Sequence, residues 1–456
     1  MTQVQQPHVR TFYLMTMTQI LSLIGSRMTG FAIGLWIYLD TGKTTPLLLV
    51  SFFQTLPPML TGSLAGVFAD RLDRRKIIML TDAGQAIPTA LLALAFFTNN
   101  FRVEMLYAAA LVSATFQTLQ GSALSAAITM LVPDEQRDRA NMLQQLMGPL
   151  AAIIGPLTAS MLYSLIQIEG IMLLDFITFL IAVAVMSQVM IPSPKESEEG
   201  KASKGSVWSE MRGGFRFLQT RPVLLGIILY ATLVNFLING PFSLATPYII
   251  GLTGNEKLAG GLMAVLHIGM VTGGLLFGMW GGTRRRVHTS MGGLLIMSVL
   301  VIALGLARTP LLLGLVMLFV LLPNPAVNAG FVSLIQAKAP PDMQGRIFSI
   351  VMQLSVLMTP ISYLITGPLV DRVLEPAVGR AGWWSAVAPI VGSETGSGMG
   401  LLMVISGAIC VLATLGTWAV PHVRSVEVDL PDYVAEVPDY EINKETTLLE
   451  IEIVAA

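Results

Sequence analysis

Three ionisable side chains, Arg27, Asp82 and Asp175, lie inside long apolar stretches of this 456-residue sequence. A charge placed at the centre of a membrane costs about 2.5–3.5 kcal/mol on insertion scales, so such residues usually have a role. A guanidinium keeps its charge and can bind an anionic group, whereas a carboxylate can take up and release a proton. The three residues are therefore candidates for binding a ligand or for coupling its movement to that of protons.

Each of these residues also has a structural interpretation. Arg27 could form an ion pair inside a helix bundle instead of anchoring a ligand. Asp82 could pair with the basic loop at 71–76 as part of a gate, and Asp175 could serve only as a hydrogen-bond acceptor. His267 titrates near neutral pH, but a lone histidine in an apolar stretch is more typical of a structural hydrogen bond.

Amide side chains provide further polar points in the apolar stretches, and some of them should line a central cavity. They form hydrogen bonds without carrying a charge, which suits the recognition of polar groups. Pro323-Asn324-Pro325 also predicts a broken helix, whose freed backbone groups should face a cavity or the protein interior. The amides are Gln19, Gln117, Gln120, Gln144, Gln145, Asn235, Asn239, Asn324 and Asn328.

The composition indicates which kind of element carries these residues. Hydrophobic residues make up 54% of the chain and charged residues 12%, whereas soluble domains average about 25% charged residues. An ordinary soluble protein is thereby excluded, and a net charge of −1 argues against nucleic-acid binding. The single cysteine, Cys410, excludes a disulfide framework and cysteine-based metal sites. No catalytic motif stands out, so we expect neither an enzyme nor a cofactor.

Continuous apolar runs predict twelve membrane-spanning helices, because a helix needs about 20 apolar residues to cross a bilayer. The runs do not alternate as the strands of a β-barrel would. The predicted fold class is therefore an all-α polytopic membrane protein. The spans cover residues 11–39, 46–69, 77–98, 103–131, 141–165, 168–191, 222–250, 257–281, 289–306, 309–336, 346–370 and 399–420.

A polar segment divides the twelve spans into two bundles of six. Residues 192–206 are rich in glycine, serine and charge, which is typical of a linker. Trp208, Met211, Phe215 and Leu218 then share one face of a predicted helix at the membrane surface. We predict an N-terminal bundle over 1–191, a cytoplasmic linker with this amphipathic helix over 192–221, a C-terminal bundle over 222–420 and an acidic tail over 421–456.

The basic residues predict the orientation of the chain in the membrane. Twenty Lys and Arg residues fall on the side of the two termini and six on the other side. Cytoplasmic loops are enriched in these residues, so both termini should lie in the cytoplasm. The tail carries a net charge of −7. It could be a solvated segment, or it could dock onto the basic loops of the same side.

The connection after the second span carries a pattern of glycine, acid and basic residues. The glycine allows two helices to approach closely, and the acid at a helix end can accept hydrogen bonds from backbone N–H groups and arginine. Such a contact could act as a gate that opens when the two bundles rock. The gating candidates here are Gly66, Asp70, Arg71, Arg74 and Arg75.

The two halves repeat parts of their sequence. Gly278 and the basic residues 284–286 follow the eighth span as Gly66 and its basic residues follow the second, although Gly282 stands where the acid should be. Pro-Asp pairs at 133–134 and 341–342 precede the fifth and eleventh spans. Repeated halves are typical of secondary transporters.

These motifs resemble those of a known family. The loop after the second span resembles the G-x-L-a-D-r-x-G-r-k motif of the major facilitator superfamily, with Asp73 in place of the second glycine. Gly155-Pro156 resembles the G-P-x-x-G-G antiporter motif of its exporters, although an ordinary kinked helix would also explain it. Stretches at 21–38, 131–145, 173–182, 367–376 and 423–432 are similar to the macrolide-efflux and enterobactin-exporter branch.

The resemblance implies a transporter whose central cavity, supplied by spans 1, 4, 7 and 10, opens alternately to each side. It further implies proton-driven export of an amphipathic small molecule, such as a drug, macrolide or siderophore. The protein would act as a monomer among the lipids of a bacterial inner membrane. The alternatives are a flippase for lysophospholipids or similar lipids, and a non-transporting membrane sensor or scaffold that uses the acidic tail.

Overall fold

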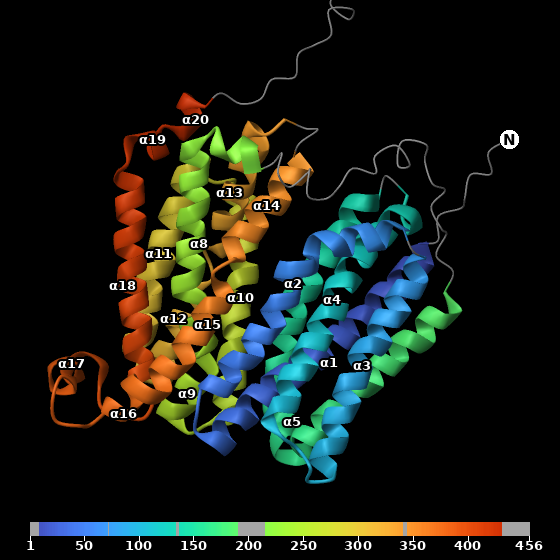
Figure 1. The fold of residues 1–456 in the computed structure, drawn as a ribbon, viewed down its shortest axis with the longest axis horizontal. Helices are drawn as coiled ribbons and strands as arrows, with labels where there is room; N and C mark the ends of the chain where they lie inside the picture. Colours follow the sequence, from blue (N-terminus) through green and yellow to red (C-terminus); the bar gives the residue numbers. More distant parts are fainter. Residues whose placement is uncertain (1–8, 72, 134–135, 190–214, 341–343, 431–456) are drawn as a thin grey trace, which may run out of the picture.

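The computed structural model describes residues 9–71, 73–133, 136–189, 215–340 and 344–430, without the side chains of 63–71, 126, 129, 130, 345, 346 and 349. Its helices form two bundles that lie side by side (Figure 1). The helix α5 is 52 residues long and bends at Gln167, which has φ 57° and ψ −174°. The first bundle contains α1 (Val9–Thr41), α2 (Thr45–Arg71), α3 (Arg74–Phe97), α4 (Val103–Leu131) and α5 (Arg137–Gln188).

The second bundle has more, and shorter, helical pieces. Its longer helices are α8 (Pro222–Ser243), α10 (Glu256–Trp280), α11 (Arg286–Leu306) and α18 (Ser397–Ala419). The shorter pieces are α9 (Ala245–Thr253), α12 (Pro310–Val320), α13 (Asn324–Lys338), α14 (Gln344–Val356), α15 (Thr359–Leu369), the π-helical turn η2 (Val370–Leu374), α16 (Glu375–Ala377), α17 (Trp384–Val391), α19 (Pro421–Arg424) and α20 (Val426–Asp429).

The prediction of twelve spans in two bundles is confirmed. Nine helical segments of the described chain are long and apolar enough to cross a membrane. The helices α2 and α4, with 27 and 29 residues, also exceed the length that a crossing requires. The bend in α5 makes two spans of one continuous helix, because its two arms run in different directions on either side of Gln167.

The predicted break in the tenth span is also present. The helix α12 ends at Val320 and α13 begins at Asn324, so the break falls on the Pro-Asn-Pro sequence. The carbonyl groups of Leu318 and Leu322 face the neighbouring helix α10, where a Cβ at Gly269 or Gly273 would lie only 1.8 or 1.9 Å from their oxygens. The backbone around the break therefore faces the protein interior, as expected for freed polar groups in a membrane.

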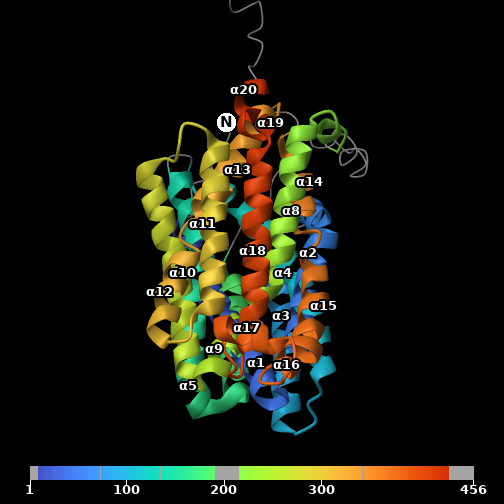
Figure 2. The ribbon, with the colours of Figure 1, turned by 90° about the vertical axis from the view of Figure 1, so that its left-hand side faces the viewer.

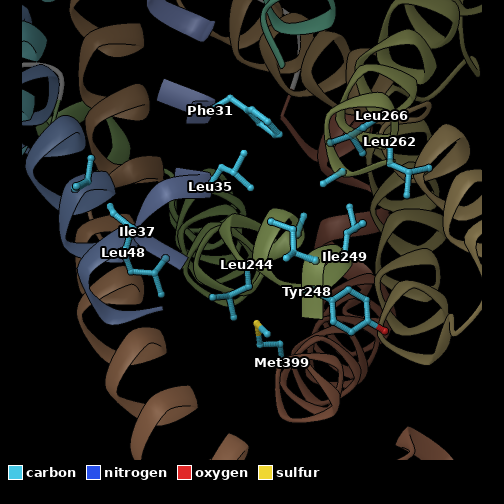
Figure 3. Packing of buried hydrophobic residues seen from close by; sticks show 14 of the residues in the cluster. Phe31, Leu35, Ile37, Leu48, Leu244, Tyr248, Ile249, Leu262, Leu266 and Met399 are labelled. Carbon is cyan, nitrogen blue, oxygen red and sulfur yellow. The ribbon is translucent and has the colours of Figure 1, made fainter. Parts of the chain in front are cut away.

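The bundles meet differently at the two ends of the molecule. We call the end at which α1 begins and α18 ends the tail end, and the end with α16, α17 and the connection at 42–44 the loop end (Figures 1 and 2). At the loop end, one buried apolar cluster joins Phe31 and Leu35 of the first bundle to Leu244 and Ile249 of the second (Figure 3). At the tail end, each bundle has a buried cluster of its own. The shared core thus ties the bundles together at the loop end.

The described part of the linker only partly matches its prediction. A short helix covers residues 215–219, and its buried side chains are Phe217 and Leu218. Phe215, which we expected on the apolar face, is 42% exposed. The face is shifted because Phe217 and Leu218 pack into the core of the second bundle. Trp208 and Met211 lie outside the described residues.

The start of the acidic tail docks onto the second bundle. Val423 and Val426 are buried, and the Lys338 ammonium donates hydrogen bonds to the carbonyl oxygens of Glu427, at 3.1 Å, and Leu430. The Glu427 carboxylate accepts a hydrogen bond from the backbone N–H of Arg286 at 2.8 Å. Docking onto the basic side of the bundle is therefore observed for residues 421–430, and the rest of the tail lies outside the described residues.

We expect Lys338→Ala to loosen this docked segment, because Lys338 donates to two of its carbonyl groups. Trypsin should then cleave after Arg424 several times faster than in the unmodified protein, as quantified by mass spectrometry of the released peptides. Arg284→Ala is the matched control, since Arg284 is an exposed basic residue of the same side. Equal cleavage rates in the two variants would show that Lys338 does not hold the segment.

Candidate functional site

A cavity of about 440 Å³ lies between the two bundles. The first bundle supplies most of its wall, and Ser243, Thr246, Met263 and His267 of α8, α9 and α10 close it from the second. The expectation that span 10 contributes is wrong for this cavity, because its described lining contains no residue of α12 or α13. Its apolar wall includes Leu23, Phe31, Leu47, Leu92, Leu106, Met263 and Phe179.

Arg27 lies on α1 and faces this cavity. Its side chain is exposed there and forms no ion pair with any other side chain that the structure describes. His267 is close enough to interact with Arg27 electrostatically, and its Nδ1 lies 2.8 Å from the Met263 carbonyl oxygen. The cavity therefore presents a permanent positive charge. The structural interpretation of Arg27 as half of an ion pair does not fit these contacts.

Asp175 is the acid in the cavity wall, and it is 2% exposed. One carboxylate oxygen accepts a hydrogen bond from the Ser26 hydroxyl at 3.3 Å. A Cβ on Gly25 would lie 2.8 Å from that oxygen, so Asp175 packs closely against the backbone of α1. This geometry agrees with a structural role that ties α1 to the second arm of α5.

Asp82 is fully buried at the centre of a cluster of amide side chains. Its two carboxylate oxygens accept hydrogen bonds from Gln19 Nε2 at 2.9 Å and Gln120 Nε2 at 2.5 Å. Gln120 Nε2 also donates to Gln19 Oε1 at 3.0 Å, and Gln85 Nε2 donates to Gln120 Oε1 at 2.9 Å. These four residues, here the amide cluster, join α1, α3 and α4.

The amide cluster reaches the cavity. Gln85 and Gln117 line both the central cavity and a second cavity of about 210 Å³, whose wall also includes Gln19, Gln120 and Gln144. Gln85 was not among the amides expected to line the cavity, although its position one helical turn after Asp82 places it on the same face of α3. A change in the hydrogen bonds of Asp82 can thus be transmitted to the cavity wall through neutral side chains.

Several other predicted amides do not line these cavities. Asn239 Nδ2 donates to the Asn235 carbonyl at 2.7 Å, and Asn328 Nδ2 donates to the Asn324 carbonyl at 3.1 Å. These asparagines thus hydrogen-bond along their own helices. Gln145 is exposed, whereas its neighbour Gln144 lines the second cavity.

The loop motif after α2 is built into the first bundle. Asp73, which departs from the family motif, caps α3 by accepting hydrogen bonds from the backbone N–H groups of Arg75 at 3.0 Å and Lys76 at 3.4 Å. The Arg75 guanidinium donates to the carbonyl oxygens of Met186, at 3.0 Å, and Ser187 at the end of α5. Arg75 therefore links α3 to α5 within one bundle. Arg74 begins α3.

For the remaining residues of this motif, the structure describes the backbone only. Gly66, Asp70 and Arg71 lie on the last turns of α2, and their side-chain positions are outside the described structure. Their role in gating stays a prediction.

A comparison with protein families identifies this architecture. A model described as Major Facilitator Superfamily matches residues 15–363. The chain belongs to the major facilitator superfamily. It is accordingly a secondary transporter and not an enzyme.

Relatives and solved structures agree with this assignment. Macrolide efflux protein A of Streptococcus pyogenes is 26% identical over 79% of this chain and 90% of its own length. Enterobactin exporter EntS of Shigella boydii is 25% identical over 86% of this chain and 89% of its own length. The structure of a bacterial homolog of the human lysosomal transporter Spinster has a TM-score of 0.72 at 16% identity, covering 95% of this chain and 100% of that one, which shows a shared fold.

The Gly-Pro sequence of this major facilitator protein lies where three helices meet. A Cβ at Gly155 of α5 would lie 2.5 Å from the Arg27 Cβ on α1, so only glycine allows this approach. Pro156 and Ser160, further along α5, lie against Gly260 of α10 in the other bundle. The motif therefore positions the charged residue of the cavity on one side and packs against the second bundle on the other.

We expect Gly155→Val to destabilise the fold by about 1–3 kcal/mol, as other overpacked interiors are, because the new side chain would overlap the Cβ and backbone of Arg27. A lower Tm in detergent would report this loss. Gly148→Val is the control, since Gly148 lies on the same helix with nothing within 4 Å of its Cβ position. Equal Tm values in both variants would contradict the close approach of α5 to α1.

Proposed function

We propose that this major facilitator protein exports amphipathic small molecules across a bacterial inner membrane by alternating access, driven by protons. The observation on which this proposal rests is an apolar cavity between the bundles that contains Arg27, whose side chain forms no ion pair with the described residues. The Gly155-Pro156 motif supports export, as does the similarity to a macrolide efflux protein and an enterobactin exporter. We place both termini in the cytoplasm, and take the protein to work as a monomer with its substrate and lipids as partners.

Arg27 would bind an anionic group of the substrate. A guanidinium offers several donors in a fixed plane and matches carboxylates and similar oxyanions. The surrounding apolar side chains would take up the rest of the molecule, while Gln54, Gln85 and Gln117 add neutral polar contacts. A substrate with an apolar body and one acidic group therefore fits the chemistry of this wall.

Asp82 would carry the coupling proton. An ionised carboxylate only accepts hydrogen bonds, whereas a protonated one also donates. Both oxygens of Asp82 accept from amide N–H groups. A proton on a lone pair used by one of these bonds would turn that acceptor into a donor, and the amide of Gln19 or Gln120 bonded there would then reorient. Gln120 accepts a hydrogen bond from Gln85, which lines the cavity. The proton would thereby change the hydrogen bonds available to the substrate.

We expect Asp82→Asn to abolish proton-driven accumulation, because asparagine cannot change its charge. In proteoliposomes with an imposed proton gradient, transport by the variant should fall to the background level while substrate exchange without a gradient persists. Asp73→Asn is the control, since Asp73 is a carboxylate of the same bundle that caps a helix outside the cavity. Unchanged gradient-driven transport by Asp82→Asn would exclude Asp82 as the proton carrier.

We expect Arg27→Gln to weaken binding of anionic compounds at least about tenfold, the effect of losing a hydrogen-bonded charge pair. Neutral compounds of similar size should bind as before, and Arg27→Lys should fall in between. The measurement is the dissociation constant for members of a panel of drugs, siderophores and lipids. Equal affinities of Arg27→Gln and the unmodified protein for anionic compounds would contradict this role. In the proteoliposome assay, a protein that moves only the lipids of the panel would be a flippase, and one that moves no member would support a sensor or scaffold.

A further inference from the structure

One carboxylate joins the two bundles directly at the loop end. Asp371, in the turn η2 of the second bundle, lies against the start of α2 in the first bundle. One of its oxygens accepts hydrogen bonds from the backbone N–H and the hydroxyl of Thr44, both at 2.8 Å. The other accepts from the backbone N–H of Thr45 at 2.7 Å and its hydroxyl at 2.5 Å. All four donors belong to the opposite bundle.

The chemistry of this contact favours a charged acceptor. The first N–H groups of a helix have no partner inside the helix, and they form its positive end. Hydrogen bonds to an ionised group are shorter and about twice as strong as those between neutral groups. Asp371 therefore caps α2 from outside its own bundle, and the cap exists only while the bundles are together at this end.

A glycine one turn earlier makes this contact possible. A Cβ at Gly367 of α15 would lie 2.8 Å from the Cα of Thr45, so a larger residue would hold the two bundles apart. Gly367, Asp371 and Arg372 also repeat the spacing of Gly66, Asp70 and Arg71. Gly66, Asp70 and Arg71 lie in the last turns of α2, at the tail end of the molecule. Gly367 lies in α15, and Asp371 and Arg372 lie in the turn η2 that follows it, at the loop end.

A second carboxylate, Glu375, lies one helical turn after Asp371 and makes its hydrogen bonds within its own bundle. Glu375 accepts hydrogen bonds from the backbone N–H groups of Gly396 at 3.2 Å and Met399 at 3.0 Å, at the start of α18. Glu375 thus caps a helix of its own bundle, whereas Asp371 caps a helix of the other. The two residues form a matched pair with the same chemistry, and only Asp371 is sensitive to separation of the bundles.

We propose that Asp371 is the latch of the gate at the loop end. It holds the bundles together on that side and must release α2 once in each transport cycle. Its counterpart is the predicted gate at Asp70, which would act at the opposite end. The proposal rests only on alternating access, which secondary transporters of this fold use, and is independent of the substrate and of proton coupling.

The test measures the separation of the bundles at the loop end. Spin labels at Asn100→Cys and Arg380→Cys, two exposed positions on opposite bundles, are introduced in a Cys410→Ala background, and their distance distribution is recorded by pulsed electron paramagnetic resonance. Asp371→Asn and Gly367→Ala should each raise the ratio of separated to closed molecules about tenfold, corresponding to about 1.4 kcal/mol. The first removes the charge, and the second forces the backbones apart.

Glu375→Gln provides the control, because it weakens a cap that does not cross between the bundles. Its distance distribution should match that of the otherwise unmodified labelled protein. Unchanged distributions in both Asp371→Asn and Gly367→Ala would overturn the proposal, as would an equal shift in Glu375→Gln. Because no substrate is needed, failure of this test is distinguishable from failure of the proposed export.

Discussion

The cost of a charge in hydrocarbon is the constraint on which this structure depends. Only 12% of the residues are charged, and the three within the apolar stretches avoid that cost in two ways. Asp82 and Asp175 are buried against neutral donors, whereas Arg27 projects into a cavity where its charge can stay hydrated or meet an anion. The position of the cavity follows from this requirement, since Arg27 would not be tolerated on the lipid face of α1.

The packing of the bundles follows from a second property of the bilayer. Lipid tails are as apolar as the helices, so burying apolar side chains between helices contributes little to their association. Close approach of the helix backbones contributes more. Gly155 brings α5 onto α1, and Gly367 brings α15 onto α2. The first contact lies within a bundle and the second crosses between bundles. Close backbone approach at a glycine therefore holds helices together within a bundle at Gly155, and at Gly367 it holds together two bundles that must separate.

The helices and the break at Pro323 could be predicted from sequence because an apolar run has few stable arrangements in a bilayer. The direction in which each helix faces could not, since these helices are apolar on nearly all sides and no stripe marks the cavity. Asn235 and Asn328 were thus expected in the cavity, whereas Gln85 was not. The spans 141–165 and 168–191 placed an interruption at Gln167, but the contact of Arg75 with the end of α5 depends on how the two arms pack after that bend, which the sequence did not indicate. The cap by Asp73 follows an ordinary rule for residues that precede a helix.

The division of the buried core has a thermodynamic consequence. One apolar cluster spans both bundles at the loop end, while the tail end has two separate clusters. Opening the loop end must therefore bring part of the shared cluster into contact with water, and hydration of apolar surface raises the heat capacity. Opening the loop end therefore raises the heat capacity, and burial of apolar surface at the tail end lowers it. The temperature dependence of the balance between the two access states is set by the difference between these two areas.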